Sequence, residues 1–269
     1  MKKKVGLIGC GTIGTGLARY IKTKLSARLS LAFLCDSNDN AARQLQKRYA
    51  PRAVRVSFDE LLKKSDLIIE AATGSVVPQL VRKGLRTHKT ILVMSIGGLL
   101  ALKDLPALIK KTSGELLLPS GAIAGLDAVA AARQATLTRV RITTAKPVAG
   151  LRGAPYFEKK GIDLSRIKKP TIVFEGNALQ AIRHFPKNIN VAALLSVAAG
   201  GPRKVAVRII TSPAFTRNTH TVEIEGSFGK ATMTTENLPS PDNPKTSYLA
   251  ILSACAMLEK TITPMKIGV

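Results

Sequence analysis

The chain has 269 residues, 45% of them hydrophobic, and 41 Lys and Arg against 17 Asp and Glu give a formal net charge of +24. Such a length suggests about two domains, and no apolar stretch approaches the ~20 residues of a membrane helix. We therefore expect a globular, cytoplasmic protein without a membrane partner. The basic residues are spread along the chain, and only four Tyr and no Trp could stack on bases. This pattern favours a solvated basic surface over specific nucleic-acid binding.

A glycine-rich motif follows the first apolar run of the chain. Residues 5–8 lead into Gly9-Cys10-Gly11-Thr12-Ile13-Gly14, which has the G-x-G-x-x-G pattern of a dinucleotide-binding turn. Gly9 allows a tight turn, Gly11 lets backbone amides approach a pyrophosphate, and Gly14 lets the following helix pack on the strand. A second apolar run, 29–35, ends in Asp36, whose carboxylate can accept both ribose hydroxyls of an adenosine. Because that carboxylate would repel a 2′-phosphate, it favours NAD over NADP, although NADP stays possible.

The first 120 residues alternate strand and helix patterns. Strands are expected at 54–56, 67–72, 90–95 and 115–119, and helices at 40–49, 78–85 and 105–110. This alternation indicates a Rossmann-type, doubly wound parallel sheet. Ligands of such sheets bind beyond the carboxyl ends of the strands, so Ala72 and Thr73 are candidate cofactor contacts. Ala122 and Ala124 are further candidates, in a small-residue turn that could equally be a tight interdomain connection.

From about residue 135 the pattern changes to runs rich in β-branched residues. These runs lie at 139–144, 205–210, 220–224 and 231–235, with helix signals at 177–183, 190–199 and 246–258 and a proline-rich linker at 237–244. We therefore expect an α/β fold in which a Rossmann-type doubly wound parallel sheet is joined by a second α+β domain on a mixed or antiparallel sheet. Residues 1–120 would form the dinucleotide-binding domain, 121–244 the substrate and catalytic domain, and 245–269 a C-terminal helix that packs back on the first domain.

The reactive side chains are few. Of three histidines, His88 and His184 have structural explanations, whereas His220 begins a strand and could do acid–base work where that strand end faces the ligand edge of the first domain. The scattered cysteines and the absence of a His, Cys and carboxylate cluster in the sequence predict no metal site and no disulfide framework. Two substrate carboxylates would need cationic or amide donors.

Five segments, in one order along nearly the whole chain, carry a resemblance. They are the glycine motif, residues 119–127, residues 185–193, residues 218–220 with Gly226 downstream, and residues 237–249. In this combination the chain resembles the L-aspartate dehydrogenase family. The runs Ser-Gly-Ala-Ile-Ala-Gly-Leu-Asp and Phe-Pro-x-Asn-x-Asn-Val-Ala are more specific for this family than the glycine motif is. Homoserine dehydrogenases have a run similar to the first of them but lack the whole set.

The resemblance implies reversible, NAD- or NADP-dependent oxidation of L-aspartate to iminosuccinate. The imine would hydrolyse to oxaloacetate and ammonia or supply NAD biosynthesis, and the enzyme would be a homodimer. The catalytic histidine of the family corresponds to His220, and its nicotinamide-binding positions to Ala124 and Asn190, with Asn188 close by. Two other classes stay open: a related oxidoreductase acting on homoserine or another small acid, and a non-catalytic NAD sensor or nucleic-acid binder.

The candidate site residues are then as follows. The cofactor-binding candidates are Gly9, Gly11, Thr12, Ile13, Gly14, Asp36, Ala72, Thr73, Ala122, Ala124, Asn188 and Asn190. The candidates for binding the substrate carboxylates are Lys146, Arg152, Asn188, Asn218 and Thr219, and a surface role is an alternative for the first four.

Overall fold

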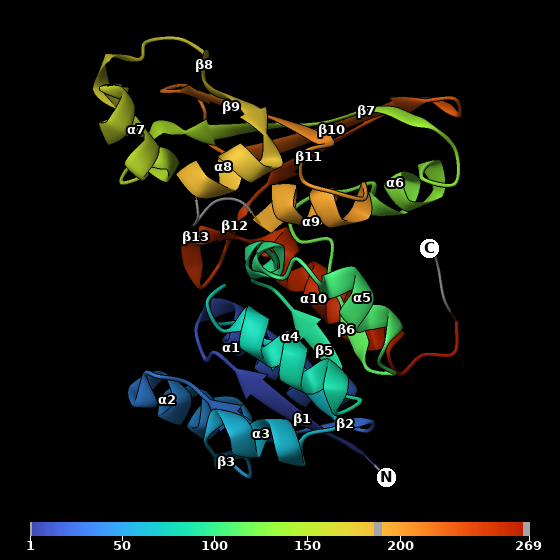
Figure 1. Cartoon of the computed structure of the whole chain (residues 1–269). Coiled ribbons are helices and arrows are strands. Elements are labelled where there is room, and N and C mark those ends of the chain that lie inside the picture. Colours follow the sequence, from blue (N-terminus) through green and yellow to red (C-terminus); the bar gives the residue numbers. More distant parts are fainter. Residues whose placement is uncertain (1, 186–189, 266–269) are drawn as a thin grey trace. The chain divides into compact units, whose positions relative to one another are not determined.

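The chain divides into two compact units. The structure is a computed structural model that describes residues 2–185 and 190–265, apart from the side chains of residues 244 and 245. One unit combines the chain up to Pro119 with the segment Ile251–Met265, and the other spans Ser120–Ala250 (Figure 1). Each unit has its own sheet, so each is described by itself.

The first unit is built on a six-stranded sheet in the order β3-β2-β1-β4-β5-β6, in which every pair of neighbours is parallel. Its strands are β1 (Lys3–Ile8), β2 (Leu29–Cys35), β3 (Val54–Arg55), β4 (Leu67–Glu70), β5 (Thr90–Val93) and β6 (Glu115–Leu117). Its helices include α1 (Thr12–Tyr20), α2 (Asp39–Tyr49), α3 (Phe58–Lys64), α4 (Val77–Arg86), α5 (Leu105–Lys110) and most of α10 (Tyr248–Lys260). The predicted Rossmann-type parallel sheet is confirmed.

Local sequence explains these elements. The residues of β4 are buried throughout, because a parallel strand with both faces covered meets apolar side chains on each side. The side chains of Asn38 and Ser57 accept hydrogen bonds from backbone amides of α2 and α3, and Glu60 completes the capping box at Ser57. On α1, a Cβ atom at Gly16 would lie 2.7 Å from Cγ2 of Ile251, so this glycine lets α10 lie against α1.

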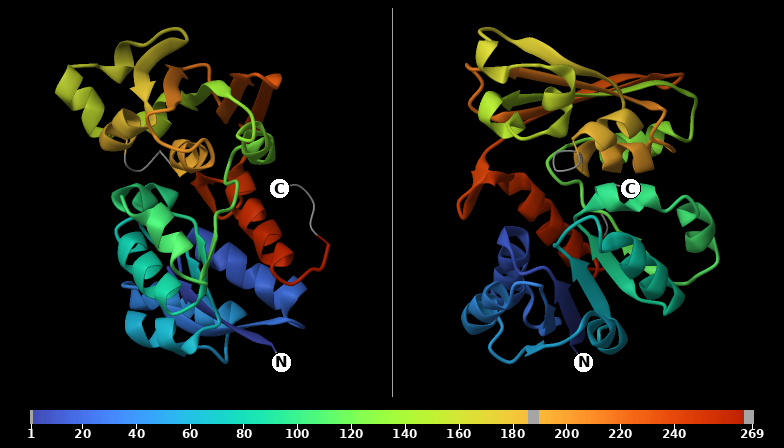
Figure 2. Two further views of the ribbon diagram at one scale, coloured as in Figure 1. Left: turned by 45° about the vertical axis from the view of Figure 1, so that its right-hand side comes forward. Right: turned by 60° about the vertical axis from the view of Figure 1, so that its left-hand side comes forward.

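The second unit is built on a five-stranded mixed sheet in the order β11-β10-β7-β9-β8, which confirms the predicted mixed or antiparallel sheet. Its strands are β7 (Leu137–Pro147), β8 (Thr171–Asn177), β9 (Val205–Ser212), β10 (Asn218–Gly226) and β11 (Gly229–Asn237), and only the pair β7 and β9 is parallel. The helices are α6 (Leu126–Ala132), α7 (Pro155–Lys160), α8 (Ala178–His184) and α9 (Asn190–Ala198). Figures 1 and 2 show α6, α8 and α9 along one face of the sheet.

The core of this second unit lies between that sheet face and its helices. Alternate residues of the strands point inward, as Val140 and Ile142 of β7 and Val222 and Ile224 of β10 do. Toward one end of the same face the inward row turns polar, where Thr144 and His220 are buried. This polar end carries the candidate site residues of the second unit.

Two local predictions differ from the structure. Strand β8 was not expected, because it follows a Pro- and Lys-rich stretch and has few alternating apolar residues. The segment 237–244, predicted as a linker, contains β12 (Pro239–Ser240), which pairs with β13 (Asn243–Ser247). Proline is tolerated at the first position of a strand, so Pro239 is compatible with the pairing of β12 and β13.

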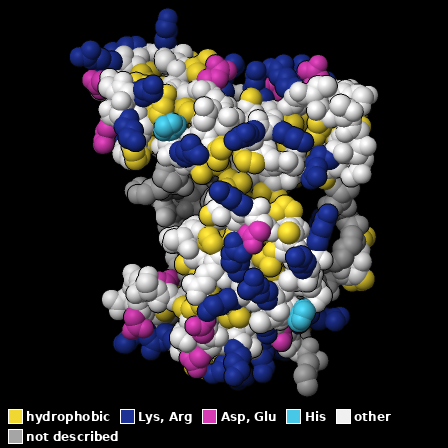
Figure 3. Space-filling view, viewed as in Figure 1, with side chains coloured by type: hydrophobic (Ala, Val, Ile, Leu, Met, Phe, Trp, Pro, Cys, Tyr) yellow, Lys and Arg dark blue, Asp and Glu magenta, His cyan; other side chains and the backbone are white. Residues whose placement is uncertain are grey.

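The charged side chains are spread over the surface. Figure 3 shows Lys and Arg over the visible face of both units rather than gathered on one element. Among the described residues, none of the helices combines the length and the apolar character that crossing a bilayer requires.

Candidate functional site

The three glycines of the motif between β1 and α1 have different surroundings. Gly9 has a φ of +95°, and a Cβ atom there would lie 2.5 Å from the backbone of Ala71. A Cβ atom on Gly14 would lie 2.0 Å from the carbonyl oxygen of Gly9, whereas one on Gly11 would meet none of the described residues within 4 Å. Gly9 and Gly14 are therefore required by packing, and the open space at Gly11, the N-cap of α1, fits the approach of a phosphate to the helix N-terminus.

The carboxylate of Asp36 is fastened beside this turn. Its Oδ2 accepts a hydrogen bond from the backbone N–H of Cys10 at 2.5 Å, and its Oδ1 accepts one from the N–H of Asn38 at 2.7 Å. Burial, together with the nearby Asp36 carboxylate, raises the pKa of the Cys10 thiol to about 12. The cysteine is thus neutral at physiological pH, and Asp36 supplies the negative charge at this corner of the turn.

Glu70, which the sequence analysis missed, joins the two loops that follow β4 and β5. Its carboxylate is fully buried. Oε1 accepts hydrogen bonds from the N–H of Ala72 and the hydroxyl of Ser95, both at 2.8 Å, and Oε2 accepts from the N–H groups of Ser95 at 2.9 Å and Met94 at 3.2 Å. Burial raises the pKa of the Glu70 carboxyl, and the four donors oppose part of that rise. A lone carboxylate at the end of an apolar strand was the available signal.

The loop held by Glu70 contains the predicted residues Ala72 and Thr73, which are both exposed. The hydroxyl of Thr73 lies 2.8 Å from that of Ser75. A Cβ atom on Gly98 would lie 2.3 Å from the carbonyl oxygen of Gly74, so the backbones of the loops after β4 and β5 are in direct contact there. Parallel strands end at one edge of a sheet, and this edge therefore carries the glycine motif, Asp36 and the loop after β4 together.

In the second unit, His220 lies on the helix-covered face of β10 and is 4% exposed. It pairs across the strands with Thr144 of β7, and its Nδ1 lies 2.9 Å from the Thr144 hydroxyl oxygen. Burial lowers the pKa of His220 to about 3, and the positive charge of Lys146 contributes to this shift. His220 is therefore a neutral imidazole at physiological pH.

Lys146 stands two residues beyond Thr144, on the same face of β7. Burial lowers the pKa of its ammonium group to about 8. Lys146 and Thr144 line a small hollow together with Val191 and Ala192 in the first turn of α9. The other described residues that line it, Leu151, Val207 and Ile209, are apolar. The hollow thus joins one cationic side chain to the end of a helix where backbone N–H groups point outward.

The turn that contains Ala122 and Ala124 is fastened to the end of β11. The carbonyl oxygen of Ala122 accepts hydrogen bonds from the hydroxyl of Thr235 at 2.8 Å and from Nδ2 of Asn237 at 3.0 Å. Within the described part of the chain, Oδ1 of Asn237 is buried without a hydrogen-bond partner. Ala122 is buried and Ala124 is exposed, so of the two alanines only Ala124 is open to a ligand in this arrangement. Sequence reasoning missed Thr235 and Asn237.

The remaining predicted residues lie as follows. Asn190 is the exposed first residue of α9, and Asn188 lies outside the described residues. Asn218 begins β10 on the same face as His220, whereas the alternation of the strand turns the side chain of Thr219 to the opposite face. The predicted role of Thr219 in substrate binding stays a prediction.

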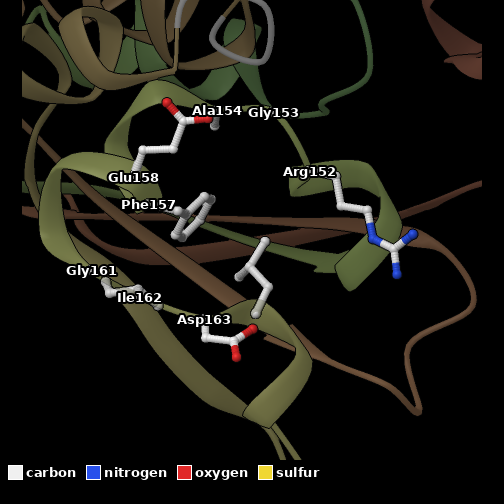
Figure 4. A pocket seen from close by; sticks show the side chains of 9 residues that line it. Arg152, Gly153, Ala154, Phe157, Glu158, Gly161, Ile162 and Asp163 are labelled. Atoms are coloured by element: carbon white, nitrogen blue, oxygen red, sulfur yellow. The ribbon is translucent and has the colours of Figure 1, made fainter.

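Arg152 also lies apart from the hollow beside Lys146. It lines a different pocket of about 360 Å³ beside α7, with Phe157, Glu158 and Asp163 among the other lining residues (Figure 4). In Figure 4 its guanidinium group points away from Glu158. Among the described residues, Arg152 does not line the hollow beside Lys146, although its neighbour Leu151 does, and its role in substrate binding stays a prediction.

Comparison with known proteins covers both units. The family described as "Aspartate dehydrogenase, C-terminal" matches residues 127–261, and the one described as "Homoserine dehydrogenase, NAD binding domain" matches residues 9–119. An L-aspartate dehydrogenase of Methanosarcina mazei is 42% identical over 98% of this chain and 99% of its own length. One of Nitrosopumilus maritimus is 38% identical over 96% of each chain.

Solved structures show the same fold. The crystal structure of aspartate dehydrogenase from Thermotoga maritima superimposes with a TM-score of 0.77 at 24% identity, over 100% of both chains. A hyperthermophilic archaeal homoserine dehydrogenase in complex with NADPH gives a TM-score of 0.62 at 10% identity, again over 100% of both chains. The nicotinamide cofactor expected from the glycine motif is thus confirmed by the match to the NAD-binding domain.

Proposed function

The chain belongs to the L-aspartate dehydrogenase family, and from this premise we propose that it interconverts L-aspartate and iminosuccinate with NAD as its cofactor. Membership makes it an oxidoreductase that acts on the CH–NH₂ group of an amino acid. The observation that carries the proposal is His220, a buried imidazole with Lys146 on the same face of the sheet, in a chain that also has an NAD-binding domain.

The first unit offers a fitting cradle for NAD. The pyrophosphate would lie over Gly11, where the described part of the chain leaves the space of a Cβ open, and against the first turn of α1. Asp36 would accept the ribose hydroxyls, and its charge supports NAD over NADP because a 2′-phosphate would be repelled. Thr12 and Ile13 would contribute backbone amides of the same turn. When bound, NAD supplies the acceptor for the hydride from the substrate α-carbon.

Each unit, taken by itself, offers candidates for contacts with the nicotinamide. Ala72 and Thr73 are the candidates in the first unit, where Glu70 fixes their backbone. Ala124, Asn190 and Asn188 are the candidates that follow from the family resemblance, and Ala122 is a further candidate in the same small-residue turn as Ala124. The two hydrogen bonds on the carbonyl oxygen of Ala122 support a rigid turn there.

Lys146 and Asn218 are the candidates for binding the substrate carboxylates. Below a pH of about 8 Lys146 is an ammonium group, which favours a carboxylate, and the start of α9 adds the positive end of a helix dipole. The net charge of +24 would also attract a dicarboxylate from solution. Oxidation would leave an imine that hydrolyses to oxaloacetate and ammonia.

The cellular setting follows the resemblance only. We propose a cytoplasmic homodimer that supplies NAD biosynthesis. The match of residues 9–119 to a homoserine dehydrogenase domain supports a second candidate, oxidation of homoserine or a similar small acid, and a substrate comparison separates the two.

Replacing His220 by Ala tests the proposed site. We expect the variant to fold and to bind NADH normally but to lose most of its turnover of L-aspartate, because the imidazole contacts the reacting groups. A matched control is His88→Asn, since His88 is exposed in the first unit with a φ of 58°, a conformation that asparagine tolerates. Near-normal kcat in His220→Ala would remove this residue from the mechanism.

A further inference from the structure

The hydroxyl group of Thr144 has one partner. Thr144 is 6% exposed, and among the described residues its oxygen is hydrogen-bonded to His220 Nδ1 alone, at 2.9 Å. The other ring nitrogen, Nε2, has no such partner in the described part of the chain. The two nitrogens of His220 are therefore in different situations: one faces a hydroxyl in the sheet, and the other is left for a ligand.

The direction of that hydrogen bond follows from counting donors. A neutral imidazole has one N–H group and one acceptor nitrogen, and a threonine hydroxyl has one proton to donate. If Nδ1 carried the proton, the Thr144 hydroxyl would accept it and its own O–H would be buried without an acceptor. If Nε2 carries the proton, Thr144 donates to Nδ1, and the N–H group without a partner is the one at Nε2, which is not among the buried unpartnered atoms of the described residues. The second arrangement avoids the cost of an unsatisfied buried donor.

We propose that Thr144 is a positioning residue that holds His220 in the neutral tautomer with its proton on Nε2, so that His220 acts on the substrate as a hydrogen-bond donor. The role in catalysis rests on the proposed function, whereas the tautomer itself does not. The substrate atom that accepts the bond is a carboxylate oxygen or the imine nitrogen beside the reacting carbon.

The surroundings of His220 support this role. Burial and the charge of Lys146 both disfavour an imidazolium, so the ring stays neutral across the physiological range. A neutral imidazole that donates from Nε2 can polarise a substrate group without itself changing charge. His220 then donates a hydrogen bond instead of accepting a proton, because its lone pair is occupied by Thr144.

The tautomer can be read directly by NMR. The full-length protein is labelled with ¹⁵N-histidine, and two-bond ¹H–¹⁵N correlations identify the unprotonated ring nitrogen. Nδ1 couples mainly to Hε1, whereas Nε2 couples to both ring protons. With only three histidines in the chain, the His220 signals are those missing from His220→Gln.

Three variants separate positioning from packing. Thr144→Val keeps the shape and removes the hydroxyl, and Thr144→Ser restores the hydroxyl. Thr221→Val makes the same change one residue from His220 on the opposite face, where Thr221 pairs with Thr234 at 3.0 Å. We expect the Nε2–H tautomer in the wild type, Thr144→Ser and Thr221→Val, and a mixture of tautomers in Thr144→Val.

Kinetics then connect the tautomer to turnover. In Thr144→Val we expect kcat/KM for L-aspartate to fall about tenfold with the Kd for NADH unchanged, and Thr144→Ser to recover most of the loss. A proton on Nδ1 in the wild type would overturn the inference, and so would an unchanged tautomer in Thr144→Val. Failure to oxidise L-aspartate together with an Nε2 proton would instead refute the proposed function and leave the tautomer assignment standing.

Discussion

Replacing Glu70 by Gln tests how the loops after β4 and β5 are held. The carboxylate accepts four hydrogen bonds, three of them from backbone N–H groups, and the side chain is fully buried. Glutamine is nearly the same shape, but one of its two terminal atoms is an NH₂ group that cannot accept. The variant therefore keeps the packing and removes acceptors.

The size of the effect follows from which oxygen is replaced. An NH₂ group in place of Oε2 would leave the N–H groups of both Met94 and Ser95 without an acceptor. An NH₂ group in place of Oε1 would leave only the N–H of Ala72 without an acceptor, because the Ser95 hydroxyl can rotate and accept a hydrogen bond from that NH₂ group. The second arrangement costs less, about 1–3 kcal/mol for one unsatisfied buried donor. Removing a buried charge offsets part of this, so we expect a net loss of about 1 kcal/mol.

Amide hydrogen exchange measures this loss within the first unit. We expect protection of the β4 and β5 amides to fall about fivefold in Glu70→Gln, and the affinity for NADH to weaken as the Ala72 loop moves. The control is Glu115→Gln, which makes the same change at an exposed residue that begins β6 of the same sheet, and it should change little. Unchanged protection in Glu70→Gln would refute the reasoning that this carboxylate joins the two loops.

The remaining predictions concern the cofactor turn and Lys146. Gly14→Ala should destabilise the first unit, because its Cβ would lie 2.0 Å from the carbonyl oxygen of Gly9. Gly11→Ala should have a normal melting temperature but bind NADH more weakly. Thermal melting measures the stability of both variants, and fluorescence titration measures their affinity for NADH. Asp36→Ala should raise the ratio of kcat/KM with NADP to that with NAD, and an unchanged ratio would deny Asp36 a part in selectivity. KM for L-aspartate should rise as the pH passes above about 8, where Lys146 loses its proton and its charge. Lys146→Met should show a high KM without that rise, and a wild-type KM that stays flat through this range would contradict the assignment.

Features set by neighbouring residues were predictable from the sequence. The glycine motif and the buried strand before Thr73 depend on local patterns, since a tight turn needs glycine and a covered parallel strand needs continuous apolar residues. The mixed sheet of the second unit followed from its β-branched runs. Strand β8 was not predicted, because this short strand follows a proline-rich stretch and lacks such a run.

Contacts between distant residues could not be predicted in this way. Glu70 meets Ser95, which is 25 residues away, and His220 meets Thr144, which is 76 residues away. Thr235 reaches the carbonyl oxygen of Ala122 across 113 residues. Strand order and register decide these pairs, and neither is written in the local pattern of a single sequence. For the same reason the sequence pointed to His220 but not to the residue that sets its tautomer.

The most direct test of the account is NADH formation with L-aspartate, D-aspartate, L-glutamate and L-homoserine, each offered with NAD and with NADP. We expect turnover to be confined to L-aspartate and to be faster with NAD. Turnover of L-homoserine in preference to L-aspartate would contradict it and would assign the chain to the related activity.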